Sequence, residues 1–397
     1  MKIETHAAAG TDIDSVRQLL SPLTEHTPDF LVVSCSSEFD LLALNAALSD
    51  LSAKALHGTT SCLGVMTNEG MAGREGNGIG YFALWDEDGA FGSAGVGFDQ
   101  TENHAASMAA RKATQLALSR AGRPGEAPDL IWVSASPGQE EEIIQGIEAV
   151  IGGGIPIVGG SAADNTVSGG WAIFGEDGIH TSGVQISVLF PSKSVAAEFQ
   201  SGYAPSGKTA KVTRAEGRRL YELDGRPAGD VYQELSGLKF EASGDGTPTA
   251  ILSQTSFDPL GVEIGGVANI PYYLLMHAAA LNSDGSIDLF ANVAEGTELH
   301  AMSGSTQSLT QRAGRVAAQT RRQADTTGAP VAGALMIYCG GCMLSVTDHM
   351  DRVVSGVNES LDGAPFLGLF TFGEQGHVLD QKNSHGNLMI SCVTFFA

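Results

Sequence analysis

The sequence predicts an α/β (α+β) fold of duplicated mixed β-sheets that are packed together and flanked by helices, in two pseudo-symmetric domains. The first observation is a phrase that recurs three times: an apolar strand, a helix, a second apolar strand ending in Gly and small polar residues, and a third strand. The second is a stretch of strand-like alternation followed by a long Ala-rich or Arg-rich helix, which occurs in each half. Repetition at this level indicates internal duplication around a shared core.

The three copies of the phrase differ in clarity. The third is the clearest, the second is nearly as plain and the first is looser. In the third copy, strands are expected at 334–338, 363–376 and 387–396. In the second copy they are expected at 129–136, 154–165 and 183–190, and in the first at 30–36, 56–64 and 78–85. The three Gly-rich loops that follow these strands would therefore lie close together. Because loops often carry functional residues, this is the expected position of a site.

The remaining elements follow from periodicity and turn residues. A short helix is expected near 12–23, a hairpin over 78–98 that turns at 86–89, and a helix from 101 or 103 to 121 with a face of alanines. The second half repeats the order, with a hairpin over 272–292 and a helix over 306–326. A polar stretch after Pro191 separates the expected domains, 1–197 and 198–397.

Charge and cysteine content narrow the function. The 397 residues hold 45 Asp and Glu against 22 Lys and Arg, a formal net charge of −23. Such a surface repels phosphate backbones and anionic lipids, so neither nucleic acid nor membrane is expected as a partner. The N-terminus lacks a signal-peptide pattern and the five cysteines lack disulfide-like spacing. The sequence therefore predicts a cytoplasmic protein with reduced thiols.

The third copy carries the strongest candidates for chemistry. Cys339 ends an apolar strand before Gly340 and Gly341, where backbone N–H groups could stabilise a thiolate nucleophile, although a buried Cys is also a small apolar residue. Glu374 follows a strongly apolar strand, which favours a raised pKa and a role as general acid or base, or as partner of a ligand ammonium. His377 would complete a nucleophilic set. Other candidate histidines are His57, His277 and His385.

Polar residues occupy the matching strand ends of the first two copies. Ser61, Cys62, Ser161 and Asn165 suit hydrogen bonding to a small ligand, and they equally suit turns. Cys339 and Cys342 form a C-x-x-C pair, but no second pair accompanies it, so no metal site is expected.

These phrases resemble the FIST family of intracellular signal-transduction domains. A FIST N-terminal domain would cover about 28–197 and a FIST C-terminal domain about 200–397. The resemblance rests on the order of short motifs along the chain, namely 58–64, 159–161, 223–228, 284–286, the strand ending at Cys339, 372–374 and Asn383.

The resemblance implies a stand-alone sensory module that binds a small polar, amino-acid-like molecule. The expected ligand-binding residues are Ser61, Cys62, Ser161, Asn165, Cys339, Gly340, Glu374 and Asn383. Two alternatives stay open: a hydrolase or lyase that uses Cys339, Glu374 and His377, and a haem-linked gas sensor. Otherwise no cofactor is expected, and the partner would be a second copy of the chain or a signalling protein.

Overall fold

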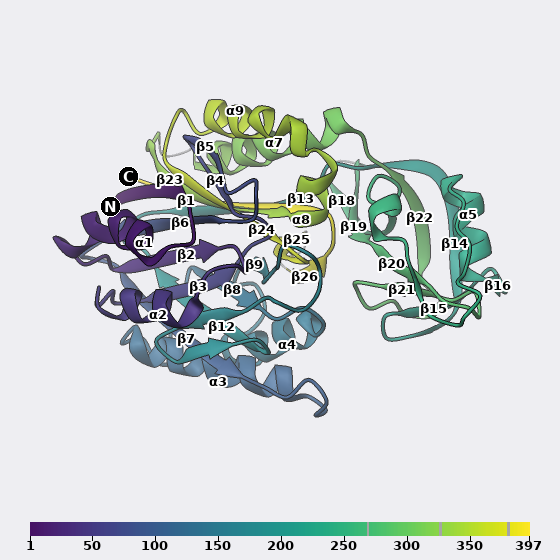
Figure 1. Ribbon diagram of the computed structural model, residues 1–397, viewed down its shortest axis with the longest axis horizontal. Coiled ribbons are helices and arrows are strands. Elements are labelled where there is room, and N and C mark those ends of the chain that lie inside the picture. The colour runs from purple at the N-terminus through teal and green to yellow at the C-terminus, as the bar shows by residue number, and fades with distance from the viewer. Residues whose placement is uncertain (268–269, 325–327, 379–381) are drawn as a thin grey trace.

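A computed structural model of the protein describes residues 1–267, 270–324, 328–378 and 382–397 (Figure 1). Within these residues the chain forms three six-stranded sheets and one nine-stranded sheet. Parallel and antiparallel pairs occur together in the six-stranded sheets, and helices cover their outer faces. The predicted fold class, mixed sheets packed together and flanked by helices, is confirmed.

The three six-stranded sheets repeat one topology, and we call the segments that build them units 1, 2 and 3. Each unit contributes four strands, and the two of them that lie at the centre of the six-stranded sheet pair in parallel, whereas the other pairs are antiparallel. Their orders are β1-β6-β2-β3, β7-β12-β8-β9 and β13-β27-β23-β24. The recurring phrase of the sequence thus corresponds to one supersecondary unit that occurs three times in the described part of the chain.

Unit 1 contains β1 (Lys2–Ala9), α1 (Ile13–Leu20), β2 (Phe30–Cys35), α2 (Leu41–Ser49), β3 (Leu56–Thr60), β4 (Val65–Thr67), β5 (Gly70–Ala72) and β6 (Gly78–Trp85). Unit 2 contains β7 (Ala90–Gly97), α3 (Ala105–Arg120), β8 (Leu130–Ala135), α4 (Glu140–Ile151), β9 (Ile157–Ser161), β10 (Ile173–Gly175), β11 (Gly178–His180) and β12 (Gly183–Phe190). Unit 3 contains β13 (Val195–Ser201), α7 (Thr306–Ala324), β23 (Val331–Cys339), α8 (Gly340–Ser345), α9 (Met350–Ser360), β24 (Phe366–Thr371), β25 (Glu374–Val378), β26 (Lys382–Gly386) and β27 (Met389–Phe396).

Each unit also lends a hairpin to a neighbouring sheet. The β4–β5 hairpin of unit 1 pairs with β24 of unit 3, and β10–β11 of unit 2 pairs with β3 of unit 1. The β25–β26 hairpin of unit 3 pairs with β9 of unit 2, which closes the cycle. Every six-stranded sheet is therefore completed by another unit.

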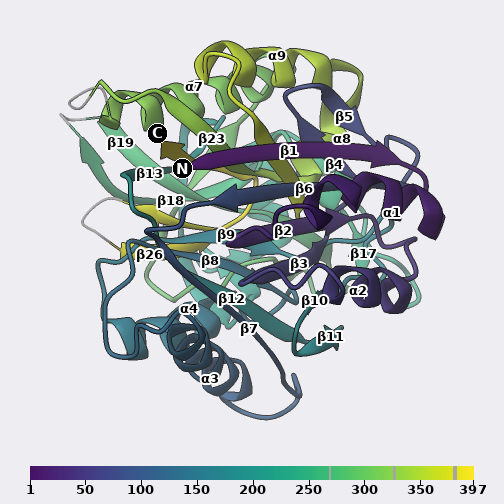
Figure 2. The same ribbon diagram turned by 90° about the vertical axis from the view of Figure 1, so that its left-hand side faces the viewer.

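The sheets are buried on both faces, which explains their almost continuous apolar strands. Alternate residues point to opposite faces. In β2, Phe30 and Val32 join a central core where the three sheets meet, whereas Leu31 and Val33 pack beneath α1 and α2. Figure 2 shows the helix pairs α1 and α2, α3 and α4, and α7 and α9 at three separate places around the sheets.

Residues 204–303 interrupt unit 3 between β13 and α7, and we call them the insert. The insert has its own hydrophobic core and lies to one side of the three units (Figure 1). It contains β14 (Ala204–Glu216), β15 (Arg219–Leu223), β16 (Arg226–Pro227), α5 (Ala228–Ser236), β17 (Thr249–Ala250), α6 (Leu252–Thr255), β18 (Leu260–Val267), β19 (Ile270–Met276), β20 (Ala278–Leu281), β21 (Ile287–Leu289) and β22 (Glu298–Ser303).

Most expected elements are present, with two corrections. The hairpin predicted over 272–292 is only partly right, because β20 pairs with β21 but β19 pairs with β18. The helix predicted from 101 or 103 to 121 is α3, and it buries Ala106, Ala109 and Ala113 as expected. The hairpin predicted over 78–98 is wrong, because β6 pairs with β1 and β2 whereas β7 pairs with β12 in another sheet. The Asp-rich turn therefore carries the chain between sheets. Of the helix predicted over 306–326, residues 325 and 326 lie outside the described residues.

Candidate functional site

The ends of β3, β9 and β24 meet at the centre of the three units. Strand register places Thr60, Ser161 and Thr371 at equivalent positions. Backbone hydrogen bonds join the ends in a cycle: Cys62 N–H donates to Phe370 O (3.0 Å), Ala163 N–H to Thr60 O (3.1 Å) and Phe372 N–H to Ser161 O (3.1 Å). The three Gly-rich loops of the sequence thus reach one place.

A cavity of about 100 Å³ lies beside this meeting point, where units 2 and 3 contact the insert. Its walls are mainly aromatic and aliphatic, and none of its described lining residues carries a formal charge at neutral pH. They are Pro137, Val167 and Trp171 from unit 2, Leu252, His277 and Phe290 from the insert, and Cys339, Gly341, Leu344, Thr371, Phe372, Gly373 and Asn387 from unit 3.

His277 is the titratable side chain that the insert contributes to the cavity. Its Nε2 lies 2.9 Å from Leu252 O, and because a carbonyl only accepts, this nitrogen carries the proton. Burial lowers the pKa of His277 to about 4, so the ring is neutral at pH 7. Its Nδ1 is then an acceptor, and it has no hydrogen-bond partner among the described residues.

Cys339 also lines the cavity, but the surroundings favour its thiol. A hydrogen bond with Cys342 and burial raise the pKa of Cys339 well above its ordinary value. The backbone N–H groups of Gly341 and Cys342 act in the opposite direction, as the sequence predicts, but they do not outweigh these causes. The role of Cys339 as a nucleophile stays a prediction. Gly340 begins α8 and packs close to Phe372.

Glu374 lies next to the cavity without lining it. Its carboxylate is fully buried and accepts hydrogen bonds from Thr371 Oγ1 (3.0 Å), Gly373 N–H (3.2 Å) and Met389 N–H (3.0 Å). Burial raises the pKa of Glu374, as the sequence predicts. The carboxylate thus joins the turn after β24 to the start of β27.

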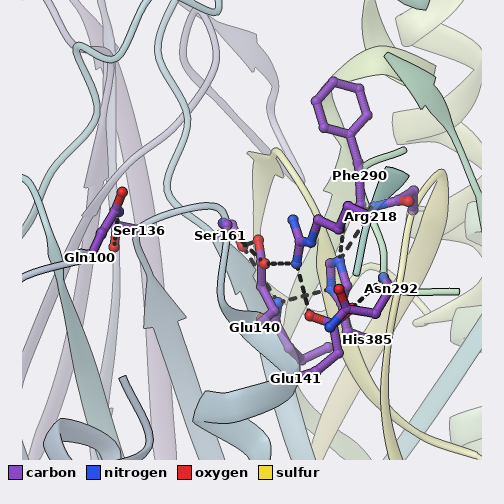
Figure 3. A network of polar contacts seen from close by, with 12 residues as sticks. Gln100, Ser136, Glu140, Glu141, Ser161, Arg218, Phe290, Asn292 and His385 are labelled. Carbon is purple, nitrogen blue, oxygen red and sulfur yellow. Dashed lines mark hydrogen bonds and ion pairs between the residues drawn. The ribbon is translucent and has the colours of Figure 1, made fainter. Parts of the chain in front are cut away.

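A buried polar network around Glu140 lies close to Gly373. Figure 3 shows its side chains. Ser161 Oγ donates to Glu140 Oε1 (2.7 Å), and Arg218 of the insert donates to Glu140 and Glu141. Burial alone would raise the pKa of Glu140. The charges of His385 and Arg218, with hydrogen bonds from Ser161 and Arg218, outweigh burial and lower this pKa to about 2.

The network and the cavity share a wall. Gly373 has φ +130°, and a Cβ there would lie 2.7 Å from His385 Cε1, so the wall is as thin as a glycine allows. His385 Nε2 lies 3.1 Å from the carbonyl of Phe290, a cavity residue. Asn387, another cavity residue, accepts from His277 N–H (3.1 Å). Cavity residues therefore contact His385, whose charge acts on Glu140, the residue that binds Arg218.

The other predicted site residues hold units together. Ser61 Oγ donates to Gly64 O (2.5 Å) and accepts from Phe370 N–H (2.8 Å). Asn165 accepts from Leu63 N–H (2.8 Å). Cys62 is fully buried, and burial with the nearby Asp164 and Cys339 raises its pKa to about 12.

His377 and Asn383 lie together on the β25–β26 hairpin. Asn383 Oδ1 accepts from Ile157 N–H (2.9 Å) and from His377 Nδ1 (3.1 Å). Neither residue lines the cavity. His277 rather than His377 lines the cavity together with Cys339.

Metal and haem chemistry find little support at this site. Among the described residues, no group of three or more His, Cys, Asp and Glu side chains could hold a metal ion. A cavity of about 100 Å³ is too small for a haem.

In the part of the chain that the structure describes, no helix is long and apolar enough to cross a membrane.

Comparison with known families decides the classification. The FIST N domain matches residues 29–226 and the FIST C domain matches residues 228–377. The chain belongs to the FIST family. FIST domains are sensory domains of signal transduction that bind small ligands. The two matched ranges meet inside the insert, and the predicted boundary at 197 stays a prediction.

The curated relatives that this FIST protein matches are themselves uncharacterised, so they assign no activity to it. An uncharacterised Mycobacterium bovis protein, Mb0898c, and an uncharacterised Mycobacterium tuberculosis protein, MT0897, are each 28% identical over 249 residues. The match covers 59% of this chain, and the chain spans only 58% of the length of each relative.

Among solved structures, two cyanuric acid hydrolases, one from A. caulinodans, align with nearly the whole FIST chain. Both are 9% identical, with TM-scores of 0.35 and 0.38. The alignments cover 99% of this chain and 98% and 99% of the hydrolases.

Sequence reasoning missed Glu140 and Arg218 in this FIST protein. Glu140 comes four residues after Ser136, which directly follows β8, and a search for acids after all strand ends would have found it. Arg218 lies 78 residues away in a turn of the insert, and no local signal pairs it with Glu140.

Proposed function

We propose that this FIST protein senses a small molecule that binds in the cavity between the strand ends and the insert. The observation that carries the proposal is the position of the cavity. It touches units 2 and 3 and the insert at once, so a ligand there would affect how these parts pack together.

The size and walls of the cavity limit the ligand. A cavity of about 100 Å³ is smaller than the roughly 300–1,000 Å³ typical of drug-sized ligands, and nearer the apolar cavity of about 150 Å³ that accepts benzene. An amino-acid-like zwitterion would bring two charges to uncharged walls, at a high desolvation cost. We therefore favour a ligand with a small apolar body and one hydrogen-bonding group.

Two polar groups would orient such a ligand. The neutral ring of His277 offers Nδ1 as an acceptor, and the Cys339 thiol is a weak donor. Asn387 and Phe290 would transmit occupancy, because both contact His385 of the network that binds Arg218. Ligand binding would thus alter the docking of the insert.

A cavity-filling variant tests the proposal. A thermal-shift panel of small alcohols, amides, acids, amino acids and haem should contain a compound that raises the melting temperature of the wild type. Leu252→Trp should abolish that shift by occupying the cavity. Leu42→Trp, an exposed position in unit 1, should keep it. A shift that survives in Leu252→Trp, or a panel without any shift, would count against the site.

A hydrolase or lyase is the second candidate, because Cys339 and His277 both line the cavity and flank Gly341. An enzyme of this kind needs a reactive thiolate. The raised pKa of Cys339 predicts the opposite: alkylation by iodoacetamide at pH 7 should be slower at Cys339 than at free cysteine. Mass spectrometry of the labelled protein would show this, and faster labelling would support catalysis.

A further inference from the structure

A second cavity, of about 750 Å³, lies between β13, β19, α7 and β25. It shares no lining residue with the central cavity. The lining residues that matter here are Glu198 on β13, Tyr272 on β19, and Arg312 and Gln319 on α7. Aromatic and aliphatic side chains, among them Phe199, Tyr203 and Ile270, form other parts of its wall.

Three buried polar atoms of this wall have no hydrogen-bond partner in the described part of the chain: Tyr272 Oη, Arg312 Nε and Gln319 Oε1. Buried polar groups in proteins are nearly always hydrogen-bonded. Two of these atoms are donors to an anion, and the third accepts an N–H or O–H group. All three atoms belong to side chains that line one cavity, so a molecule bound there could supply the missing partners after small rotations of these side chains.

The wall carries one carboxylate, Glu198, and one guanidinium, Arg312, and only the carboxylate has hydrogen-bond partners among the described residues. Glu198 already accepts hydrogen bonds at both oxygens, from Gln323 Nε2 (2.6 Å) and Gln200 Nε2 (3.1 Å). Arg312 forms no hydrogen bond or ion pair with any described residue, and burial lowers its pKa. An arginine nevertheless stays protonated in proteins. The charge of Glu198 acts on it and raises its pKa, but no carboxylate among the described residues forms an ion pair with it.

We propose that this cavity binds an organic carboxylate that also carries a neutral N–H group, such as an N-acyl amino acid. Arg312 and Tyr272 hold the carboxylate, since the planar guanidinium matches carboxylate geometry. Gln319 Oε1 accepts the ligand N–H. The aromatic and aliphatic wall covers the remaining side chain of the ligand. This site goes beyond the function proposed above, which concerns the central cavity.

Isothermal titration calorimetry with the twenty N-acetyl-L-amino acids tests the proposal. At least one should bind the full-length protein. Its carboxamide, which lacks the charge, and its O-acetyl hydroxy-acid analogue, which lacks the N–H, should each bind more weakly. We expect about a tenfold or greater loss for the carboxamide, as for a hydrogen bond to a charged group.

Variants of the wall provide the matched comparison. Arg312→Met should weaken binding by about tenfold or more, whereas Arg315→Met, an exposed arginine of the same helix, should leave it unchanged. Tyr272→Phe removes one hydroxyl and should weaken binding of the acid more than of the carboxamide. Leu252→Trp fills only the central cavity and should bind normally, which separates this site from the first.

Three results would overturn the inference: no N-acetyl amino acid binds, the carboxamide binds as tightly as the acid, or Arg312→Met binds as tightly as wild type. The second cavity would then hold solvent only. Melting temperatures establish that each variant folds. If Arg312→Met does not fold, the comparison of acid with carboxamide on wild type and on Tyr272→Phe decides.

Discussion

Glu140 shows how a single residue can depend on partners far along the chain. It begins α4 of unit 2, is almost completely buried and contacts Ser161 and Arg218. A buried carboxylate without partners would be strongly destabilising. Arg218 of the insert and Ser161 of β9 offset the cost of burying this charge. Glu140 thus joins the insert to unit 2.

The lowered pKa of Glu140 predicts a pH-dependent contribution to stability. Its pKa falls from an ordinary 4.5 to about 2 in the folded protein. The stabilisation is therefore complete above the unfolded value of 4.5 and is lost as pH falls toward 2, and it is on the order of 3 kcal/mol. Urea unfolding at pH 7, 5, 4 and 3 should show wild type and Glu140→Gln converging below pH 4.5.

A matched control uses an exposed carboxylate. Glu87 lies in the exposed turn between β6 and β7, so Glu87→Gln should differ little from wild type at any of these pH values. If the free-energy difference between wild type and Glu140→Gln stays constant from pH 7 to pH 3, the assigned pKa is wrong.

At the scale of elements, the exchanged hairpins explain the roles of several predicted site residues. Ser61, Asn165 and Asn383 are predicted ligand-binding residues, and each makes hydrogen bonds between units in the structure. Short polar side chains at Gly-rich strand ends satisfy backbone groups that a change of sheet leaves unpaired. The same chemistry would suit a ligand, so sequence could not separate the two roles.

Asn383 offers a test at this scale. Its side chain bonds Ile157 N–H, Glu148 Oε1 (2.9 Å) and Ile155 O (3.0 Å), all in unit 2. Asn383→Ala should lower the free energy of unfolding by about 1–3 kcal/mol, because it leaves backbone groups unpaired. Lys382→Ala, an exposed neighbour on β26, should cost less than 1 kcal/mol. Equal losses in urea unfolding would show that Asn383 does not hold the hairpin.

At the scale of the molecule, the three units are interdependent. β4 of unit 1 pairs with β24, and β9 of unit 2 pairs with β25, so the first half of the chain has two open sheet edges without the second half. Open edges and exposed apolar faces favour aggregation. From the cycle of hairpins we therefore expect the body of three sheets to fold as one unit, even though its parts repeat.

Splitting the chain at the predicted boundary tests this. Residues 1–197 expressed alone should be aggregated or lack a cooperative thermal transition, as followed by circular dichroism and size-exclusion chromatography. Coexpression with 198–397 should restore a complex that melts cooperatively. A monomeric and cooperatively folded 1–197 fragment would show instead that the halves are independent domains.

The sequence by itself determined the repeated strands, the helix faces and the acidic surface, because these follow from local periodicity and composition. It also pointed to Cys339 as a candidate site residue, and this residue lines the central cavity. Tertiary structure alone decided which sheet each hairpin completes, that β6 and β7 separate, and that His277 rather than His377 lines the cavity with Cys339. The physical reason is separation along the chain: Ser61 bonds Phe370 across 309 residues and Glu140 meets Arg218 across 78, and no local pattern encodes such contacts.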